Sequence, residues 1–320
     1  MPETITSGLN SLQFRETLTN ELDKALVQKS VTASFLDNSF GSKFVGTKTI
    51  LIPDIDFVGL GDYDRAEGFP EGGITVEQKP YTLTQERARR FYVDRMDMDE
   101  IGIAGLSGQI MGEFVRTKVT PEVDAYNLSK LAGITINTEG PKSNDKKQVI
   151  GYGQSFVNKS VSLLTQAIQA VQNEVGFDEE LVAICNTDFY GDLMSTSELT
   201  RRLDISDFKK GEISTKVRKL DECWIMPAPK GRMMTEYKFL DGVATAEKDG
   251  GFIPTENAEN IGFIVLPKRV AKFVKKLEKI RTFAPDTVQK KDAWQFDYRL
   301  YYDMLVKASE KGAIYSYIYK

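Results

Sequence analysis

The sequence predicts an α+β protein, built from a long helix, very long terminal strands and a separate α/β unit. Three observations predict this class. Residues 294–306 alternate apolar and polar side chains, which is the strongest period-two pattern in the chain. Residues 97–133 carry apolar side chains at helical spacing. Between residues 150 and 266, helical and strand-like segments follow one another in turn.

The sequence pattern of the N-terminal region predicts an arm rather than a domain. Residues 11–29 form one amphipathic segment, in which Leu12, Leu18, Leu22 and Leu26 lie near one helical face. The segment that follows, up to residue 42, is polar and rich in Ser, Thr and Asn. We therefore expect a short helix followed by an extended connection.

Residues 48–93 predict a long projecting ribbon. Residues 48–57 are rich in β-branched side chains, and Pro53 places them at an edge or a bulge. Residues 74–77 and 81–93 are again extended, and Arg87 and Arg89 interrupt the apolar side chains of the second run. A strand with this much charge does not fit the centre of one subunit's core, so we expect it to project and to pack against another molecule.

The loop between these strands is rich in glycine and in carboxylates, and the stem is basic. A calcium site is the alternative interpretation of the loop, but the spacing lacks the closing Glu and the fixed Gly of an EF-hand. Because opposite charges at the two ends of an extended hairpin cannot meet within one chain, we expect them to contact neighbouring copies. These predicted inter-subunit residues are Asp62, Asp64, Arg65, Glu67, Glu71, Arg87, Arg89 and Arg90.

Residues 97–133 predict a long helix that is packed along its length. Asp97 is a candidate N-cap, and Gly133 is the predicted end. Thr120 and Pro121 have the pattern of a helix start, so the helix is expected to be interrupted there. Glycines recur on one face, each costing about 1 kcal/mol relative to alanine, and close packing of a neighbour must compensate for that cost.

The predicted α/β unit covers residues 150–266. An amphipathic helix is expected from Ser155 to Val175, where Gly176 ends it. Residues 181–185 read as a buried strand, and Asn186 caps a short helix that reaches Met194. Further strands are expected at residues 213–217, 223–226 and 261–266.

The C-terminal region predicts strands of unusual length. The run from Trp294 to Val306 would extend about 43 Å at ~3.3 Å per residue. We expect residues 313–319 to turn back and pair with it. The basic residues between 268 and 281 are interpreted as a solvated face.

The composition argues against several classes of function. The chain has no histidine, which removes the commonest general base and metal ligand. Cys185 and Cys223 stand in apolar runs without metal-ligand spacing, so we expect buried thiols. The net charge of −4 favours only local, non-specific contact with DNA. No signal peptide, membrane span, cofactor motif or catalytic motif is recognised, and we expect neither an enzyme nor a cofactor.

Several strings resemble those of tailed-phage major capsid proteins with the Hong Kong 97-type fold, in particular those of phages and prophages of Gram-positive hosts. They are residues 59–65 (GLGDYDR), 84–91 (TQERARRF), 94–97 (DRMD), 111–118 (MGEFVRTK) and 121–126 (PEVDAY). The resemblance implies an N-terminal arm (1–42), an extended loop (43–97) and a peripheral domain with a spine helix (98–149). It also implies an axial domain (150–266) and a return to the peripheral sheet (267–320).

The resemblance further implies a shell of pentamers and hexamers that encloses double-stranded DNA, with maturation from a procapsid. A scaffolding domain within the chain is not expected, so a separate scaffolding protein and a portal protein are the implied partners, with assembly in the host cytoplasm. No Lys–Asn–Glu cross-linking trio can be matched. The alternatives are an encapsulin-type compartment with the same fold and a histidine-free hydrolase or sugar-binding domain in residues 150–266.

Overall fold

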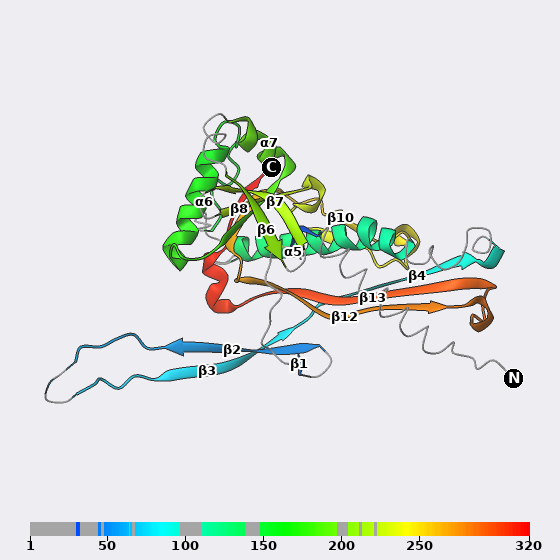
Figure 1. The fold of residues 1–320 in the computed structure, drawn as a ribbon, viewed down its shortest axis with the longest axis horizontal. Coiled ribbons are helices and arrows are strands. Elements are labelled where there is room, and N and C mark those ends of the chain that lie inside the picture. The colour runs from blue at the N-terminus through cyan, green and yellow to red at the C-terminus, as the bar shows by residue number, and fades with distance from the viewer. Residues whose placement is uncertain are drawn as a thin grey trace.

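The computed structural model shows two sheets joined by a long helix, with a hairpin that projects from their junction (Figure 1). It describes residues 30–32, 44–45, 48–63, 65, 68–96, 110–137, 148–196, 204–210, 213–220 and 223–320. The expected helix at 11–29, the start of the long helix at Asp97 and most of the arm lie outside these ranges. In the parts of the chain so described, no helix is both long and apolar enough to cross a membrane.

The first sheet has six strands in the order β14-β11-β5-β8-β7-β6. Their bounds are β5 (Leu181–Asn186), β6 (Asp204–Lys210), β7 (Ile213–Leu220), β8 (Cys223–Ala228), β11 (Asn260–Pro267) and β14 (Tyr315–Tyr319). Helices α6 (Ser160–Val175) and α7 (Thr187–Ser195) cover one face. Every residue of β5 is buried, because Ala183 and Cys185 face α6 while Val182 and Ile184 face α5.

Local sequence signals explain the ends of these helices. The Asn186 side chain accepts a hydrogen bond from the Phe189 amide at 2.8 Å, which confirms the predicted N-cap of α7. Gly176 ends α6 with φ of +89°, a conformation that favours glycine. The predicted start of α6 at Ser155 is five residues early. The chain turns at Asn158, which has φ of +59°, before the helix begins.

The second sheet, called the long sheet below, has the order β12-β13-β4. It consists of β4 (Gln85–Asp94), β12 (Ala271–Phe283) and β13 (Ala293–Val306). The period-two prediction for residues 294–306 is confirmed, since Phe296, Tyr298, Leu300 and Tyr302 are buried in one cluster against the long helix. A second cluster, with Tyr301 and Leu305, covers part of the opposite face.

Two strands are placed differently from the sequence prediction. Residues 313–319 were expected to pair with 294–306, but β14 pairs antiparallel with β11 in the six-stranded sheet. Residues 85–94 were expected to project with the ribbon, but β4 pairs along its whole length with β13. Its exposed charged side is accommodated because β4 is an edge strand.

The long helix continues through its predicted interruption. Helical residues 110–114 lead into a π-helical turn, η1 (Val115–Val119), and then into α5 (Thr120–Asn137). The Thr120 amide bonds to the Val115 carbonyl, so the helix widens by one residue just before Pro121, which has no amide hydrogen to donate. The prediction that Gly133 ends the helix is wrong, because α5 extends four residues beyond it.

A buried carboxylate on α5 holds residues 30–32. The Asp124 side chain, with no exposed surface, accepts from the Val31 and Thr32 amides, each at 3.1 Å, and from the Ser30 and Thr32 hydroxyls at 2.6 and 2.7 Å. Arg232 completes the site at 3.1 Å. The N-terminal region is therefore tied to the helix between the two sheets.

The remaining elements are short. The projecting hairpin consists of β1 (Phe44–Val45), β2 (Thr49–Phe57) and β3 (Ile74–Thr82). A small two-stranded sheet of β9 (Tyr237–Phe239) and β10 (Phe252–Pro254) lies beside α5. Short 3₁₀ helices are η2 (Lys230–Arg232), η3 (Thr245–Glu247), η4 (Pro285–Thr287) and η5 (Ala308–Ala313).

Candidate assembly surfaces

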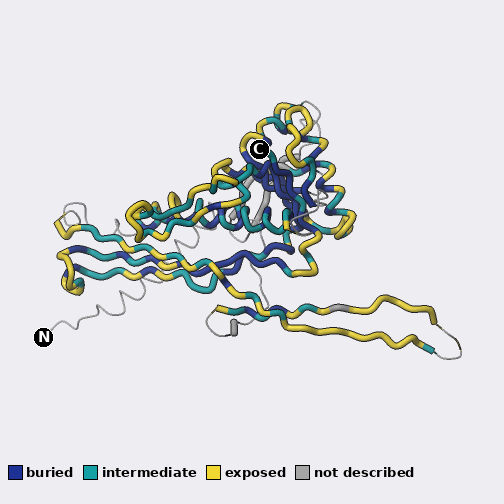
Figure 2. Tube along the Cα trace, turned by 180° about the vertical axis from the view of Figure 1, so that it is seen from behind, coloured by how far each residue is buried: buried dark blue, intermediate teal, exposed yellow. Residues whose placement is uncertain are grey.

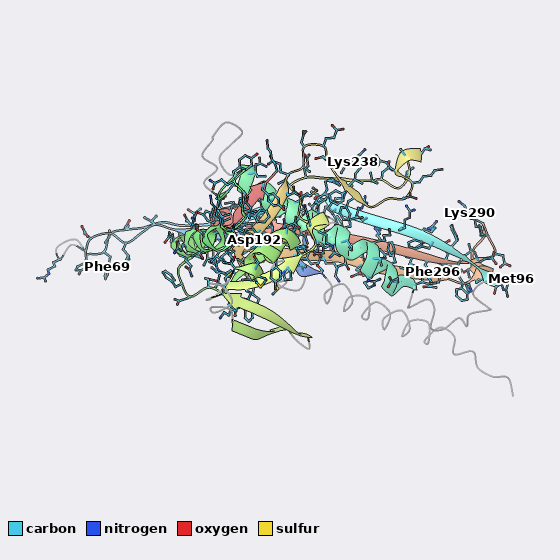
Figure 3. All side chains as sticks on the ribbon, turned by 90° about the horizontal axis from the view of Figure 1, so that it is seen from above. Phe69, Met96, Asp192, Lys238, Lys290 and Phe296 are labelled. Carbon is cyan, nitrogen blue, oxygen red and sulfur yellow. The ribbon has the colours of Figure 1, made fainter. Side chains whose placement is uncertain are left out.

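The hairpin exposes an apolar surface that the subunit itself does not cover. Figure 2 shows the outer part of the hairpin as exposed, and Figure 3 places Phe69 at the opposite end of the molecule from Met96 and Lys290. Of the fourteen exposed large hydrophobic residues among the described positions, eight lie here: Ile55, Phe57, Val58, Leu60, Tyr63, Phe69, Ile74 and Val76. A surface of this kind marks a site of association.

One aromatic contact connects the two sides of the hairpin tip. The rings of Tyr63 and Phe69 meet edge to face with centroids 5.0 Å apart. Asp62, Arg65 and Glu71 are exposed, whereas Asp64 and Glu67 lie outside the described residues. The two described carboxylates make no ion pair with any described residue, so their charge is directed to solvent.

The basic residues that were expected on the hairpin stem lie on β4. Arg87 is engaged within the subunit: its guanidinium contacts Glu122 at 2.5 Å and donates to the carbonyls of Leu240 and Gly251 at 3.0 and 3.3 Å. Arg89 donates to the Lys248 carbonyl at 2.9 Å. These two side chains hold residues 240–251 over β4, which is a role that the sequence pattern did not reveal.

Arg87→Met is expected to loosen residues 240–251 and to lower the free energy of unfolding by about 1–3 kcal/mol, because three charge-assisted contacts are lost. Hydrogen exchange of the peptides that cover 240–251, together with urea unfolding, measures both effects. Arg89→Met, which removes one carbonyl contact, is the matched control with a smaller effect. Unchanged exchange in Arg87→Met would contradict the assignment.

Arg90 lies on the opposite face of β4 and borders a basic hollow. Its guanidinium binds both oxygens of Asp297 at 2.6 and 3.0 Å, and this carboxylate raises the pKa of Arg90. The hollow has a volume of about 390 Å³, and it is called the basic hollow below. It is lined by Ala88, Arg89, Arg90, Lys279, Arg281, Asp297, Tyr298 and Arg299.

Strand pairing assembles the cations of the basic hollow. Lys279 lies opposite Arg299 on the neighbouring strand, and Arg281 lies opposite Asp297. Arg299 is paired with Glu86. Lys279 and Arg281 are exposed and make no ion pair with any residue that the structure describes. Residues 268–281 were interpreted from their sequence as a solvated face, so neither strand β12 nor the basic hollow was predicted. The alternation of Lys279, Ile280 and Arg281 is a sequence signal for the strand.

A second hollow, of about 760 Å³, lies between β4, the start of α5 and residues 240–252. Arg87 and Glu122 line it, and their mutual ion pair satisfies both charges. A hydrolase or sugar-binding site in residues 150–266 would be favoured by a pocket with convergent polar groups beside the six-stranded sheet. The basic hollow lies on the long sheet, and the second hollow lies between that sheet and residues 240–252 rather than beside the six-stranded sheet.

Comparison with known structures gives broad fold matches. The capsid of Ralstonia phage GP4 matches with a TM-score of 0.55 and 10% identity, covering 91% of each chain. The mature capsid of bacteriophage PhiM1 matches with a TM-score of 0.55 and 10% identity, covering 89% of this chain and 91% of that one. A virus-like particle from Pyrococcus furiosus matches with a TM-score of 0.50 and 12% identity, covering 96% and 100%.

No protein-family model and no curated protein matches the sequence. The fold likeness nevertheless extends over most of both chains, and it includes the mixed helix and sheet architecture described above. The chain therefore has the fold of phage capsid proteins.

Proposed function

We propose that this chain is the major capsid protein of a tailed double-stranded DNA phage, a structural subunit without catalytic activity. The observation that carries the proposal is a capsid fold whose hairpin exposes a large apolar surface. Such a surface is stable in a soluble protein when copies of the chain cover it. We assign the subunit to pentamers and hexamers of an icosahedral shell.

In this assignment the parts of the fold correspond to those of the Hong Kong 97-type family. The hairpin β1–β3 is the extended loop, and the helix that ends with α5 is the spine helix. The long sheet belongs to the peripheral domain, and the six-stranded sheet with α6 and α7 is the axial domain. Because β4 pairs with β13, we propose that the extended loop ends near Thr82, whereas the resemblance implied an end at residue 97.

We propose that the acidic hairpin tip of one copy occupies the basic hollow of a neighbour. Asp62 and Glu71 have no ion-pair partner among the described residues, and the same is true of Lys279 and Arg281. Arg90 lines the same hollow but is paired with Asp297, and Arg87 is paired with Glu122, so Lys279 and Arg281 are the cations proposed to receive the tip. Each exposed pair contributes only about 0–1 kcal/mol, but the contact repeats throughout a closed shell.

The proposed partners are a separate scaffolding protein, a portal protein and packaged DNA. With a net charge of −4, the chain would contact DNA locally and without sequence preference. Assembly would take place in the host cytoplasm, and the mature shell would be part of the virion.

Expression of the chain with and without its phage partners tests this function. Electron microscopy and size-exclusion chromatography are expected to show particles with the partners and polydisperse or aberrant particles without them. A sharply monomeric species that never assembles, even with all partners present, would overturn the proposal. Uniform full-sized shells from this chain alone would show that assembly requires no separate scaffolding protein.

The contents of the purified particles distinguish the proposal from the encapsulin-type alternative. Particles from a phage infection are expected to contain double-stranded DNA. An enzyme cargo in place of DNA would favour the compartment. Assembly is also expected to slow at ~1 M salt, where the Debye length is about 3 Å and exposed ion pairs are screened.

A further inference from the structure

The chain passes from the hairpin into the body at residues 83 and 84. Thr84 is the second of two residues between β3 and β4, where the chain leaves the hairpin and enters the long sheet (Figure 1). Leu83, beside it, is 2% exposed and packs in one cluster with Ile50 and Tyr301. The Tyr301 hydroxyl also donates to the Leu83 carbonyl at 3.0 Å. This side of the junction is therefore mainly an apolar contact.

The other side of the junction is a polar cluster around Asp303, a residue of β13 with no exposed surface. One carboxylate oxygen accepts from the Thr84 amide and hydroxyl at 3.0 and 3.1 Å. The second accepts from the Tyr126 hydroxyl at 2.9 Å and from the Lys130 ammonium at 2.5 Å. The hydroxyl oxygens of Tyr126 and Thr84 lie 2.8 Å apart, so either hydroxyl can donate to the other in place of its bond to Asp303. A single buried carboxylate thus connects the hairpin junction, the long sheet and α5.

We propose that this Asp303 cluster is a joint that fixes the direction in which the hairpin leaves the body and couples that direction to α5. Apolar contacts are not directional, so the Leu83 cluster permits the hairpin to pivot. Hydrogen bonds weaken steeply when their angles change, so the bonds from Thr84 to Asp303 resist the same movement. The inference concerns the subunit alone; only its consequence for shell geometry rests on the proposed function.

The chemistry of the cluster favours a fixed arrangement. Burial raises the pKa of Tyr126, so its hydroxyl keeps its proton and remains a donor. Lys130 supplies the positive charge that a fully buried carboxylate requires. Asp303→Asn keeps the shape of the side chain, but it replaces one acceptor oxygen with a donor, so either Thr84 or the Tyr126 and Lys130 pair loses its acceptor.

Distance measurement by pulsed electron paramagnetic resonance on the full chain tests the joint. Spin labels at Val76→Cys on β3 and Phe177→Cys after α6 report the hairpin direction, since both positions are exposed and the native cysteines are fully buried. The parent protein is expected to give one narrow distance distribution. Asp303→Asn is expected to widen this distribution about twofold or to shift its centre. Asp249→Asn is the control and is expected to leave the distribution unchanged, because the Asp249 carboxylate is exposed and has no ion-pair partner among the described residues.

Tyr126→Phe serves as the second variant, because it removes one hydroxyl and leaves the Asp303–Lys130 pair intact. It is expected to fold and to give a smaller widening. Circular dichroism and elution volume establish folding for every variant. The proposal is overturned if Asp303→Asn folds and gives the same distance distribution as the parent protein. If Asp303→Asn fails to fold, an unchanged distance distribution in Tyr126→Phe overturns it. Failure of shell assembly alone bears on the proposed function and not on the joint.

Discussion

Lys279→Glu combined with Arg281→Glu is expected to block shell assembly while the subunit still folds. Both side chains are exposed on the edge strand β12 and make no ion pair with a described residue, so the subunit is expected to fold with both replaced. In the proposed contact, two attractive interactions with a neighbour's hairpin tip become two repulsive ones. At roughly 1 kcal/mol for each contact, the yield of particles should fall by more than about tenfold. Particle counts by electron microscopy and circular dichroism of the subunit measure the two effects.

A charge swap makes this prediction specific. Asp62→Lys with Glu71→Lys, placed in the same chain as the two glutamates, is expected to restore assembly. Lys311→Glu with Lys320→Glu is the matched control, because it makes the same charge change at exposed positions outside the hollow. If the Lys279/Arg281 variant gives the same particle yield as the parent, or if the charge swap does not restore assembly, the hairpin tip binds elsewhere.

Asp124→Ala is expected to lower the free energy of unfolding by about 3–5 kcal/mol, because it leaves a mostly buried guanidinium without its partner. Arg232 is 21% exposed and would lose its carboxylate, and the Val31 and Thr32 amides would lose their acceptor. For a chain of this size the midpoint of thermal unfolding should fall by roughly 10 °C. Calorimetry and urea unfolding provide the measurement.

Asp249→Ala is the control for this second prediction. Its carboxylate is exposed and makes no ion pair with the described residues, so the change should be within about 0.5 kcal/mol. Asp124→Asn should fall between the two, because it keeps one acceptor oxygen for the amides. Equal stability of Asp124→Ala and the parent would show that residues 30–32 contribute nothing through this site.

Elements with local signals were predictable from the sequence. Asn186 and Gly176 determine the ends of helices through contacts within a few residues, and the structure has both where the pattern placed them. Strand β13 was predictable for another reason: one face of it is buried along most of its length, so its alternation is nearly complete. The fold class followed from these elements.

Pairing between distant segments was not predictable from the sequence. The apolar residues of β14 fit either sheet equally well as a pattern, and only the three-dimensional arrangement places them beside β11. Strand β12 carries so many lysines that its pattern resembles a solvated surface, because an edge strand buries only part of its side chains. The partners of Arg87 were not predictable for the same reason, because they lie 35 and more than 150 residues away in the sequence.

The two prolines of the hairpin have a consequence for solubility. A free pair of strands with exposed apolar side chains invites strand-by-strand addition of further copies, which is the route to fibres. Pro53 on β2 and Pro80 on β3 lack the amide hydrogens that an added strand would need. The two prolines thereby disfavour the addition of a strand at these positions, which favours association through side chains that can select one partner and one orientation.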